Sequence, residues 1–401
     1  MEHNRGAAQA LEMIISRISL KNWRNFRDVD TPLGNRAFLV GPNASGKSNF
    51  LDAVKFLRDL ARSGGGLQKA VLDRGGLSKI RCLAARAHPD VEVCVELSEP
   101  TSAEGSPAEW RYAVGIRQQT RGYRQPLLKF EKVWRQGELI LDRPDESDKA
   151  DELLLTQTHL EQINANRGFR PVAGFLQSVL YLHLVPQLVR NPEAFVPGQA
   201  ALSDPFGRNF LERVMATPEK TRKARLRRIE EALRLAVPQF RGLSAVKDDA
   251  GTPHLETNYK HWRADGAKQR EDQFSDGTLR LIGLLWSLQE GEAPLLLEEP
   301  ELSLNPAIVR QLPGVIHQLQ KVRGGRQVIL STHSSELLNT RSIGGHEVLM
   351  LIPTMEGTDV QLASSVADVQ RLLEGGMAIG DAVLPRTEPS EASQLSLSLS
   401  A

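Results

Sequence analysis

The stretch Val40-Gly41-Pro42-Asn43-Ala44-Ser45-Gly46-Lys47-Ser48-Asn49 decides the fold of this chain. It fits the phosphate-binding pattern G-x-x-x-x-G-K-[ST]. An apolar run at 37–40 precedes it and is typical of a buried strand, and apolar residues recur at helical spacing over 49–57. Because the motif occurs between a strand and a helix, we interpret the stretch as a phosphate loop and not as a glycine-rich turn that matches by chance.

Backbone N–H groups of such a loop point inward at a helix N-terminus and form a nest for anions. Lys47 is expected to reach the β- and γ-phosphates, and the Ser48 hydroxyl is expected to bind Mg²⁺. The residues expected to contact the nucleotide here are Asn43, Ala44, Ser45, Gly46, Lys47, Ser48 and Asn49. The sequence therefore predicts ATP and Mg²⁺ as ligands.

The bulk properties are those of an ordinary soluble protein. The 401 residues suit one large α/β unit with an insertion, and a net charge of +1 gives no global field for a polyanion. The two cysteines, Cys82 and Cys94, lack metal-binding spacing and fit a reducing cytosol. No apolar run approaches the ~20 residues that span a bilayer, and the N-terminus lacks the apolar core of a signal peptide. We expect a cytoplasmic protein without a membrane partner.

Between the chemical motifs, short β-like runs from 91 to 141 predict an antiparallel meander appended to the nucleotide fold. A buried strand is expected over 179–185, and a helix over 217–237 that begins at Thr217-Pro218-Glu219 with Thr217 as its cap. The expected organisation is a disordered leader (1–11), a first ATPase lobe with the loop and the meander (12–190), a helical insertion (191–241), a second lobe (242–386) and a disordered tail (387–401).

The helix over 217–237 carries a cluster of basic residues: Lys220, Arg222, Lys223, Arg225, Arg227 and Arg228. Such a cluster can form a patch for a phosphate backbone, and a DNA contact is one interpretation. The other is a solvated helix face balanced in part by Glu230 and Glu231. The second interpretation is favoured.

The stretch Pro294–Glu301 is an apolar strand that ends in adjacent carboxylates. In an open α/β sheet the carboxyl ends of the strands form the ligand cleft, so both carboxylates are expected beside the phosphate loop. Glu298 is expected to hold the Mg²⁺, and Glu299 to polarise the attacking water as general base. A surface acidic cluster is the alternative, which is weakened because carboxylates after four apolar positions are costly to bury without a cation.

Two further stretches complete the chemistry. Gln327–Ser334 reads as a buried strand that ends at His333, which is expected to reach a γ-phosphate or the attacking water. Ser275, Asp276 and Gly277 open a helix and form a second anion cradle. A nucleotide already seated on the first loop does not need this second cradle, so we expect it to serve the ATP of another chain.

These motifs, in this order and followed by Leu302–Pro306, resemble the ABC-type ATPases of the RecF and SMC group. More narrowly, the chain is similar to the compact bacterial predicted AAA-family ATPases of that group, which lack a long coiled coil. The resemblance implies a P-loop NTPase head of the ABC type. Such a head has a mixed or parallel core sheet flanked by helices, an antiparallel β-meander and a helical insertion.

The resemblance also implies a homodimer that sandwiches two ATP molecules. The loop of one protomer would face Ser275, Asp276 and Gly277 of the other, and Ser303 and Asn305 would lie in the loop that crosses the interface. His333 would be the switch histidine, and Arg24, within Arg24–Phe26, would contact the nucleotide. Gln187 would sense the γ-phosphate and the metal, although Gln177 competes for that role.

The sequence departs from the group's pattern in three places. Glu298 stands where most members have Asp, so its carboxylate reaches one methylene further and hydrolysis is expected to be slow. Asp276 replaces the second glycine of the transporter-type signature. Asn305 replaces a frequent histidine, which affects only a local interface contact.

The first function hypothesis is a dimeric ATPase, converting ATP and water to ADP and phosphate, in DNA repair, genome maintenance or antiphage defence. The alternative is a slowly hydrolysing, nucleotide-gated scaffold that holds or releases a separate effector protein such as a nuclease. The sequence shows no nuclease-type carboxylate cluster outside the ATP site, which favours a need for such a partner. A motor for a membrane transporter is disfavoured, since no segment indicates a membrane dock.

Overall fold

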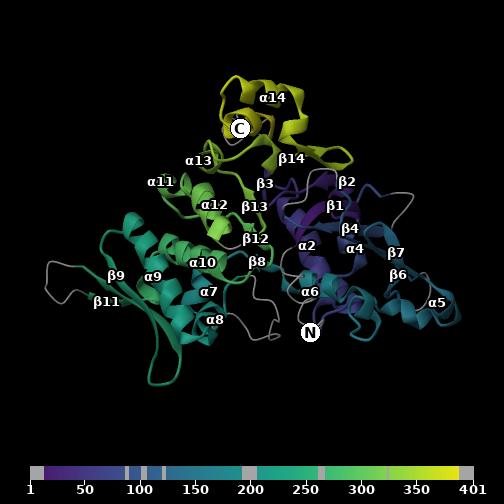
Figure 1. Cartoon of the computed structure of the whole chain (residues 1–401), viewed down its shortest axis with the longest axis horizontal. Coiled ribbons are helices and arrows are strands. Elements are labelled where there is room, and N and C mark those ends of the chain that lie inside the picture. The colour runs from purple at the N-terminus through teal and green to yellow at the C-terminus, as the bar shows by residue number, and fades with distance from the viewer. Residues whose placement is uncertain are drawn as a thin grey trace, which may run out of the picture. The chain divides into compact units, whose positions relative to one another are not determined.

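The computed structural model describes residues 13–85, 90–100, 106–119, 123–191, 206–260, 267–322 and 325–387 (Figure 1). The predicted leader at 1–11 lies outside the described residues, as does the predicted tail at 387–401 except for Thr387, which is the last residue of helix α15 (Ile379–Thr387) and not part of a tail. The chain divides into two compact units. The first comprises 1–180, 292–296 and 324–401, and the second comprises 181–291 and 297–323.

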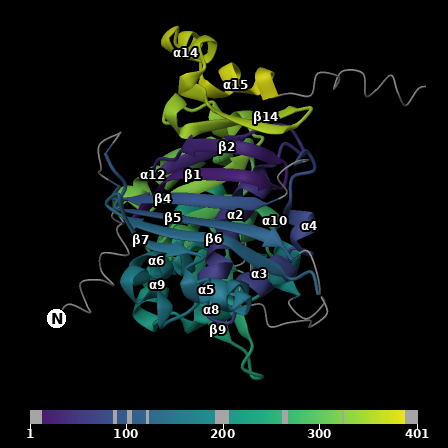
Figure 2. The ribbon, with the colours of Figure 1, turned by 90° about the vertical axis from the view of Figure 1, so that its right-hand side faces the viewer.

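The first unit contains a six-stranded antiparallel sheet in the order β2-β1-β4-β5-β6-β7, seen in Figure 2. Its strands are β1 (Ile14–Trp23), β2 (Phe26–Pro32), β4 (Val91–Ser98), β5 (Trp110–Gln118), β6 (Pro126–Arg135) and β7 (Glu138–Arg143). Val91, Val93 and Val95 are buried while the residues between them are half-buried, because alternate side chains point to opposite faces of a strand. The predicted meander is confirmed.

A second sheet has the order β15-β14-β3-β13-β12-β8. Its strands are β3 (Arg36–Val40), β8 (Leu180–Leu182), β12 (Leu295–Glu298), β13 (Val328–Thr332), β14 (Val348–Thr354) and β15 (Gly357–Leu362). The central strand β3 pairs in parallel with β13 and β14, and all five of its residues are buried. Such continuous burial is typical of a parallel strand that is covered on both faces.

Strand β8 is shorter than the sequence predicts. The apolar run 179–185 forms a strand only at Leu180–Leu182, and helix α7 (Pro186–Arg190) begins directly after Val185. Proline at the first helical position has a backbone angle suited to a helix, so Pro186 starts a helix where the sequence suggested only a strand end.

Helix α2 (Lys47–Ala61) follows β3 and packs against α6 (Arg170–Ser178) in the first unit. The other helices of this unit are α3 (Leu67–Leu72), α4 (Leu77–Ile80), α5 (Glu146–Ala150), α13 (Ser335–Leu338), α14 (Ala367–Glu374) and α15 (Ile379–Thr387), with 3₁₀ turns at Glu152–Thr156, Ala165–Phe169, Gly345–Glu347 and Ala363–Ser365. Trp23, Phe50 and Phe56 are fully buried at the interface of α2 with β1 and β2. This packing fixes the position of the first turn of α2, where the phosphate loop ends.

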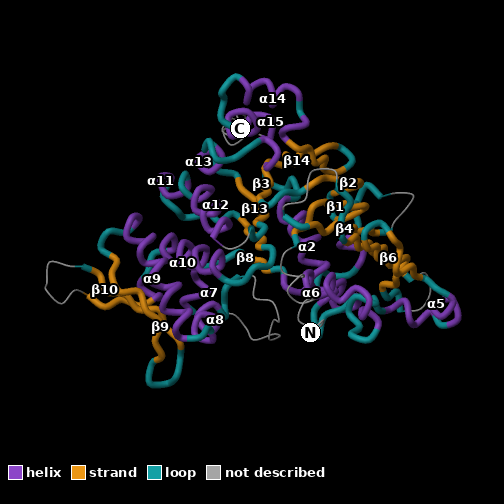
Figure 3. The backbone as a smooth tube through the Cα atoms, in the orientation of Figure 1, coloured by secondary structure: helices purple, strands orange, loops and turns teal. Residues whose placement is uncertain are grey.

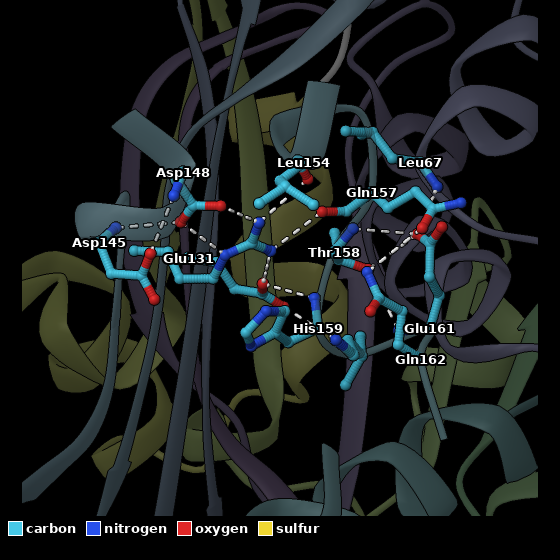
Figure 4. A network of polar contacts seen from close by, with 12 residues as sticks. Leu67, Glu131, Asp145, Asp148, Leu154, Gln157, Thr158, His159, Glu161 and Gln162 are labelled. Carbon is cyan, nitrogen blue, oxygen red and sulfur yellow. Dashed lines mark hydrogen bonds and ion pairs between the residues drawn. The ribbon is translucent and has the colours of Figure 1, made fainter. Parts of the chain in front are cut away.

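A buried polar cluster joins the meander to the segment that follows it (Figure 4). Arg143 donates to Glu131 over 3.1 Å and to Asp148 over 2.6 Å, and all three side chains are at most 3% exposed. Glu131 also accepts hydrogen bonds from the backbone N–H groups of His159 and Leu160. Burial raises the pKa of the Glu131 carboxyl, and these hydrogen bonds oppose the rise. The cluster therefore holds the chain at 145–162 against β6 and β7.

The second unit is built from helices and a three-stranded sheet in the order β11-β10-β9 (Figure 3). Its strands are β9 (Phe240–Lys247), β10 (Pro253–Tyr259) and β11 (Ala267–Arg270). Its helices are α7, α8 (Phe210–Ala216), α9 (Glu219–Ala236), α10 (Asp276–Gln289), α11 (Pro306–Val309) and α12 (Leu312–Val322), with a 3₁₀ turn at Glu271–Gln273. Among the helices described in either unit, none is long and apolar enough to span a membrane.

The predicted helix over 217–237 is α9, but its predicted cap is wrong. Helix α9 begins at Glu219, so Thr217 lies one position before the N-cap, and its hydroxyl donates to the carbonyl of Arg213 in α8. Pro218 occupies the N-cap position of α9 and makes no side-chain hydrogen bond to the helix. The apolar residues Leu226, Ile229 and Leu233 are buried at helical spacing, as expected of an amphipathic helix.

Candidate nucleotide site

The phosphate loop lies between the end of β3 and the start of α2, as the sequence predicts. Ala44 and Gly46 have positive φ angles of 63° and 98°, and Gly46 is the N-cap of α2. The Lys47 ammonium is only 6% exposed and donates to the carbonyl oxygens of Gly41 and Pro42, over 2.9 and 3.1 Å. A tight left-handed turn at a helix N-terminus, with a buried cation beneath it, is the arrangement of an anion nest.

Gly41 is a position where only glycine fits. A Cβ atom there would lie 2.7 Å from the carbonyl oxygen of Leu351 in β14 and 2.5 Å from the Ser45 hydroxyl. Both distances are shorter than van der Waals contact, so the loop packs directly on the neighbouring strand.

His333 reaches the same edge of the sheet as the phosphate loop within the first unit. In the parallel pairing of β13 with β3, Thr332 stands opposite Val40. His333 therefore follows its strand at the level where Gly41 follows β3, and its side chain is exposed. This placement agrees with the expectation from the sequence, while a role in catalysis stays a prediction.

The predicted nucleotide contact Arg24 lies beside α2. Its guanidinium donates to the Asp52 carboxylate over 3.2 Å and to the Lys79 carbonyl over 3.0 Å. The next residue, Asn25, contacts the loop itself: its amide donates to the Ser45 carbonyl over 2.7 Å and accepts from the Asn49 amide over 2.8 Å. Sequence reasoning did not single out Asn25, because no spacing rule connects it to a loop twenty residues later.

In the second unit, the predicted signature opens helix α10. Ser275 is its N-cap and accepts a hydrogen bond from the Thr278 backbone over 3.2 Å. The Asp276 carboxylate forms an ion pair with Arg190 at 2.6 Å and accepts from the Gln187 amide over 3.1 Å. The structure thus brings Gln187 together with the signature. Its competitor Gln177 lies exposed in α6 of the first unit.

The predicted interface loop packs against the signature. A Cβ atom on Gly277 would lie 2.5 Å from the carbonyl oxygen of Ser303, so glycine is required for this approach. Ser303 itself has a positive φ of 63°. Asn305 accepts from the Ala307 backbone over 2.9 Å and caps α11. These contacts fix the loop's shape, and its place in a dimer interface stays a prediction.

The paired carboxylates lie at the end of β12 as predicted, with Glu298 as its last residue and Glu299 directly after it. Glu298 is half-buried and accepts a hydrogen bond from the Tyr181 hydroxyl, a partner that the sequence did not reveal. Glu299 has a positive φ of 42°, an uncommon conformation for a residue other than glycine. Burial lowers the pKa of the Arg280 guanidinium, and the carboxylates of Asp276, Glu299 and Glu301 oppose that change. Glu299 therefore lies within electrostatic reach of a cation.

The predicted metal ligands suit magnesium in their chemistry. Ser48 offers a hydroxyl and Glu298 a carboxylate, and both are the hard oxygen donors that Mg²⁺ prefers. Ser48 belongs to the first unit and Glu298 to the second.

Most of the basic side chains of α9 are engaged within the second unit. Arg222 donates to the carbonyls of Met215 and Thr217, and Arg225 stacks on the Trp286 ring at 5.3 Å. Lys223 and Arg227 pair with glutamates one helical turn away. Lys220, Lys223, Arg227 and Arg228 are exposed, whereas Arg222 and Arg225 are half-buried, so the basic surface offered to a phosphate backbone is smaller than the cluster suggests.

Comparison with known proteins places this chain in a family. Residues 36–339 match the family described as "AAA domain, putative AbiEii toxin, Type IV TA system". The "DNA replication and repair protein RecF" of Brucella abortus (strain 2308) and that of Brucella suis biovar 1 (strain 1330) are each 33% identical over 87 residues. That stretch covers 20% of this chain and 22% of the length of those relatives.

Two solved structures share the fold. One is an SMC head bound to the C-winged helix domain of ScpA, with a TM-score of 0.50, 16% identity, and coverage of 86% of this chain and 96% of that one. The other is the Smc head domain of Pyrococcus furiosus bound to the C-terminal domain of ScpA. It has a TM-score of 0.50, 13% identity, and coverage of 90% and 99%.

The chain belongs to this family of AAA domains, since the match spans most of its length. Its fold is a P-loop head of the ABC type, as in the RecF and SMC group, and the fold class expected from the sequence is confirmed.

Proposed function

We propose that this protein binds ATP with Mg²⁺ at Gly41–Ser48 and hydrolyses it slowly to ADP and phosphate. The observation that carries the proposal is the anion nest, formed by the left-handed turn at Gly46 and the buried Lys47 at the start of α2. Membership of a P-loop ATPase family supports it. We also propose a cytoplasmic location.

The remaining roles follow from the chemistry of each side chain. Ser48 and Glu298 would hold the Mg²⁺, which supplies positive charge against the phosphate oxygens when bound. Glu299 would accept a proton from the attacking water, and His333 would donate a hydrogen bond near the γ-phosphate. Arg24 and Gln187 are proposed to contact the nucleotide after leaving their present partners.

We further propose that ATP joins two copies of the chain. Ser275, Asp276 and Gly277 present the N-terminus of α10, which favours an anion, and a second copy would bring its bound ATP to it. Ser303 and Asn305 would lie at this interface, since Ser303 packs directly against Gly277.

The test of this scheme uses the variant Glu299→Gln, which keeps the shape of the side chain and removes its basicity. We expect it to bind ATP, to fail to turn it over and to accumulate as a dimer in analytical ultracentrifugation only when ATP and Mg²⁺ are present. Lys47→Ala is the matched control and should stay monomeric, because it lacks the cation of the nest. A monomer in every Glu299→Gln sample that demonstrably binds ATP would overturn the sandwich.

For the biological role, we propose DNA repair, genome maintenance or antiphage defence. The RecF match supports the first two, and the toxin–antitoxin description of the family supports the third. The alternative is a nucleotide-gated scaffold for a separate effector such as a nuclease. That alternative is supported by α9, where Arg222 and Arg225 contact the protein itself and Lys223 and Arg227 are paired with glutamates at the surface. Co-purification separates the two, since the scaffold requires a partner that ATP retains or releases.

A further inference from the structure

Asn25 lies in the tight connection between β1 and β2, directly against the phosphate loop. Its amide nitrogen donates to the Ser45 carbonyl and to the Thr358 hydroxyl, each over 2.7 Å, and its amide oxygen accepts from Asn49 over 2.8 Å. A carbonyl can only accept, so the bond to Ser45 fixes which end of the amide faces the loop. Both N–H donors of the Asn25 side chain are thereby used, and its oxygen accepts one hydrogen bond.

The loop and Asn25 also fit each other in shape. A Cβ atom on Gly46 would overlap the Asn25 amide, so the side chain packs on the glycine that opens α2. Asn49, which donates to Asn25, stands in the first turn of α2, and its carbonyl accepts from the Trp23 indole over 2.8 Å. One side chain therefore holds the loop and the start of the helix in a single arrangement.

The β14–β15 hairpin completes this contact from the far end of the sequence. The Thr358 backbone donates to the Asn25 carbonyl over 2.8 Å, and a Cβ atom on Gly357 would lie 2.5 Å from the same oxygen. Glu356 at the tip forms an ion pair with Arg27 of β2. Thr358 is only 5% exposed. Strand β15 contacts β2, and Figures 1 and 2 show β14, its partner in the hairpin, near β2.

We propose that Asn25 and Thr358 are positioning residues of the nucleotide site, and that the hairpin sets the affinity of the phosphate loop for ATP. This inference rests on the proposed function. The nest binds phosphate only while its backbone N–H groups converge, and the Ser45 carbonyl is part of that backbone. Thr358 fixes the amide of Asn25, and Asn25 fixes Ser45 and Gly46. Neither residue touches the nucleotide itself.

The experiment measures the dissociation constant for ATP by isothermal titration calorimetry in the wild type and four variants: Thr358→Val, Thr358→Ser, Thr354→Val and Asn25→Asp. Thr358→Val keeps the volume of a buried side chain and removes only its hydroxyl, whereas Thr358→Ser retains the hydroxyl. Thr354→Val is the matched control, because the Thr354 hydroxyl is exposed and bonds within the hairpin to Gly357. The melting temperature of each protein without nucleotide is measured alongside.

We expect Thr358→Val to bind ATP about fivefold more weakly, the equivalent of one hydrogen bond. Its melting temperature should fall slightly, because the Asn25 amide loses this acceptor in the nucleotide-free protein as well. Thr358→Ser should recover most of the affinity, and Thr354→Val should match the wild type. Asn25→Asp should lose at least tenfold, because a carboxylate oxygen would then face the Ser45 carbonyl. If Thr358→Val and the wild type bind ATP with equal affinity, this inference is wrong and the proposed function is unaffected. A wild type that binds no ATP would remove the proposed function and this inference with it.

Discussion

The buried cluster around Arg143 yields a prediction about stability that follows from burial and charge. Arg143→Met removes the cation between Glu131 and Asp148, whose side chains are 0% and 3% exposed. It also leaves the carbonyl oxygens of Leu154 and Gln157 without this donor. Breaking one partner of a buried ion pair costs about 3–5 kcal/mol, since the other charge stays buried. We expect the first unit to lose about that much free energy of unfolding at neutral pH.

The loss should depend on pH in a defined direction. Burial already raises the pKa of Glu131 above its unfolded value of about 4.3, so the folded state binds more protons than the unfolded state. Stability from this group is therefore lost as the pH rises through the folded pKa. Arg143 lowers the pKa of the Glu131 carboxyl, as a neighbouring cation does. The pKa of Glu131 therefore rises further in Arg143→Met. The destabilisation should be larger near pH 8 than near pH 5, at about the same ionic strength.

Urea unfolding monitored by circular dichroism is the assay. With an m-value of about 3 kcal/mol/M, the expected cost shifts the midpoint by about 1–1.7 M. The control is Arg117→Met, which removes an exposed pair with Glu152 from the same sheet and should cost about 0–1 kcal/mol. The reasoning is refuted if Arg143→Met unfolds at the midpoint of this control, or if its loss is greater at the lower pH.

Two further predictions concern the second unit. The hydrogen bond with Glu271 raises the pKa of His254, so its stabilisation is present below about pH 6.5 and is lost as the pH rises through the folded pKa. His254→Gln should therefore flatten the pH dependence of unfolding in that window, and an unchanged profile would contradict this. Charge reversal of Lys220 and Arg228 should reduce the salt-dependent part of any DNA affinity, measured by fluorescence anisotropy at several salt concentrations. A variant that binds DNA with the same salt slope as the wild type would exclude this face of α9.

The local parts of the nucleotide site could be predicted from the sequence because each is encoded in a short stretch. The loop Gly41–Ser48 needs a strand before it, a helix after it and glycine at fixed positions, and the structure has all three. The end of β13 and the capped start of α10 are also each encoded in a short stretch of sequence. His333 follows the end of β13 and Ser275 caps α10, as expected. The meander followed from period-two alternation, which one buried face imposes on a sheet.

The predictions that failed did so because the residue concerned contacts a partner that its own stretch of sequence does not reveal. Thr217 has the side chain of a good helix cap, but the carbonyl of Arg213 in the preceding helix accepts its hydroxyl. The apolar run 179–185 has the composition of a long strand, but it forms a strand only at Leu180–Leu182, and the Val185 backbone N–H donates to the Phe206 carbonyl just before α7. Arg225 belonged to the basic cluster for which a solvated face was the favoured interpretation, but it stacks on Trp286. In each case the chemical character of the residues was predicted correctly, but the group that they contact in the structure was not.

Contacts between distant segments lie beyond sequence reasoning for a physical reason. Asn25 and Thr358 are 333 residues apart, and their hydrogen bond exists only because β2 lies beside the β14–β15 hairpin. Hydrophobic periodicity says which face of each strand is buried, but it does not say which strands become neighbours. The phosphate loop can therefore be recognised in the sequence as a motif, whereas the side chains that fix its conformation cannot. Through those side chains, the β14–β15 hairpin can influence the affinity of the phosphate loop for ATP.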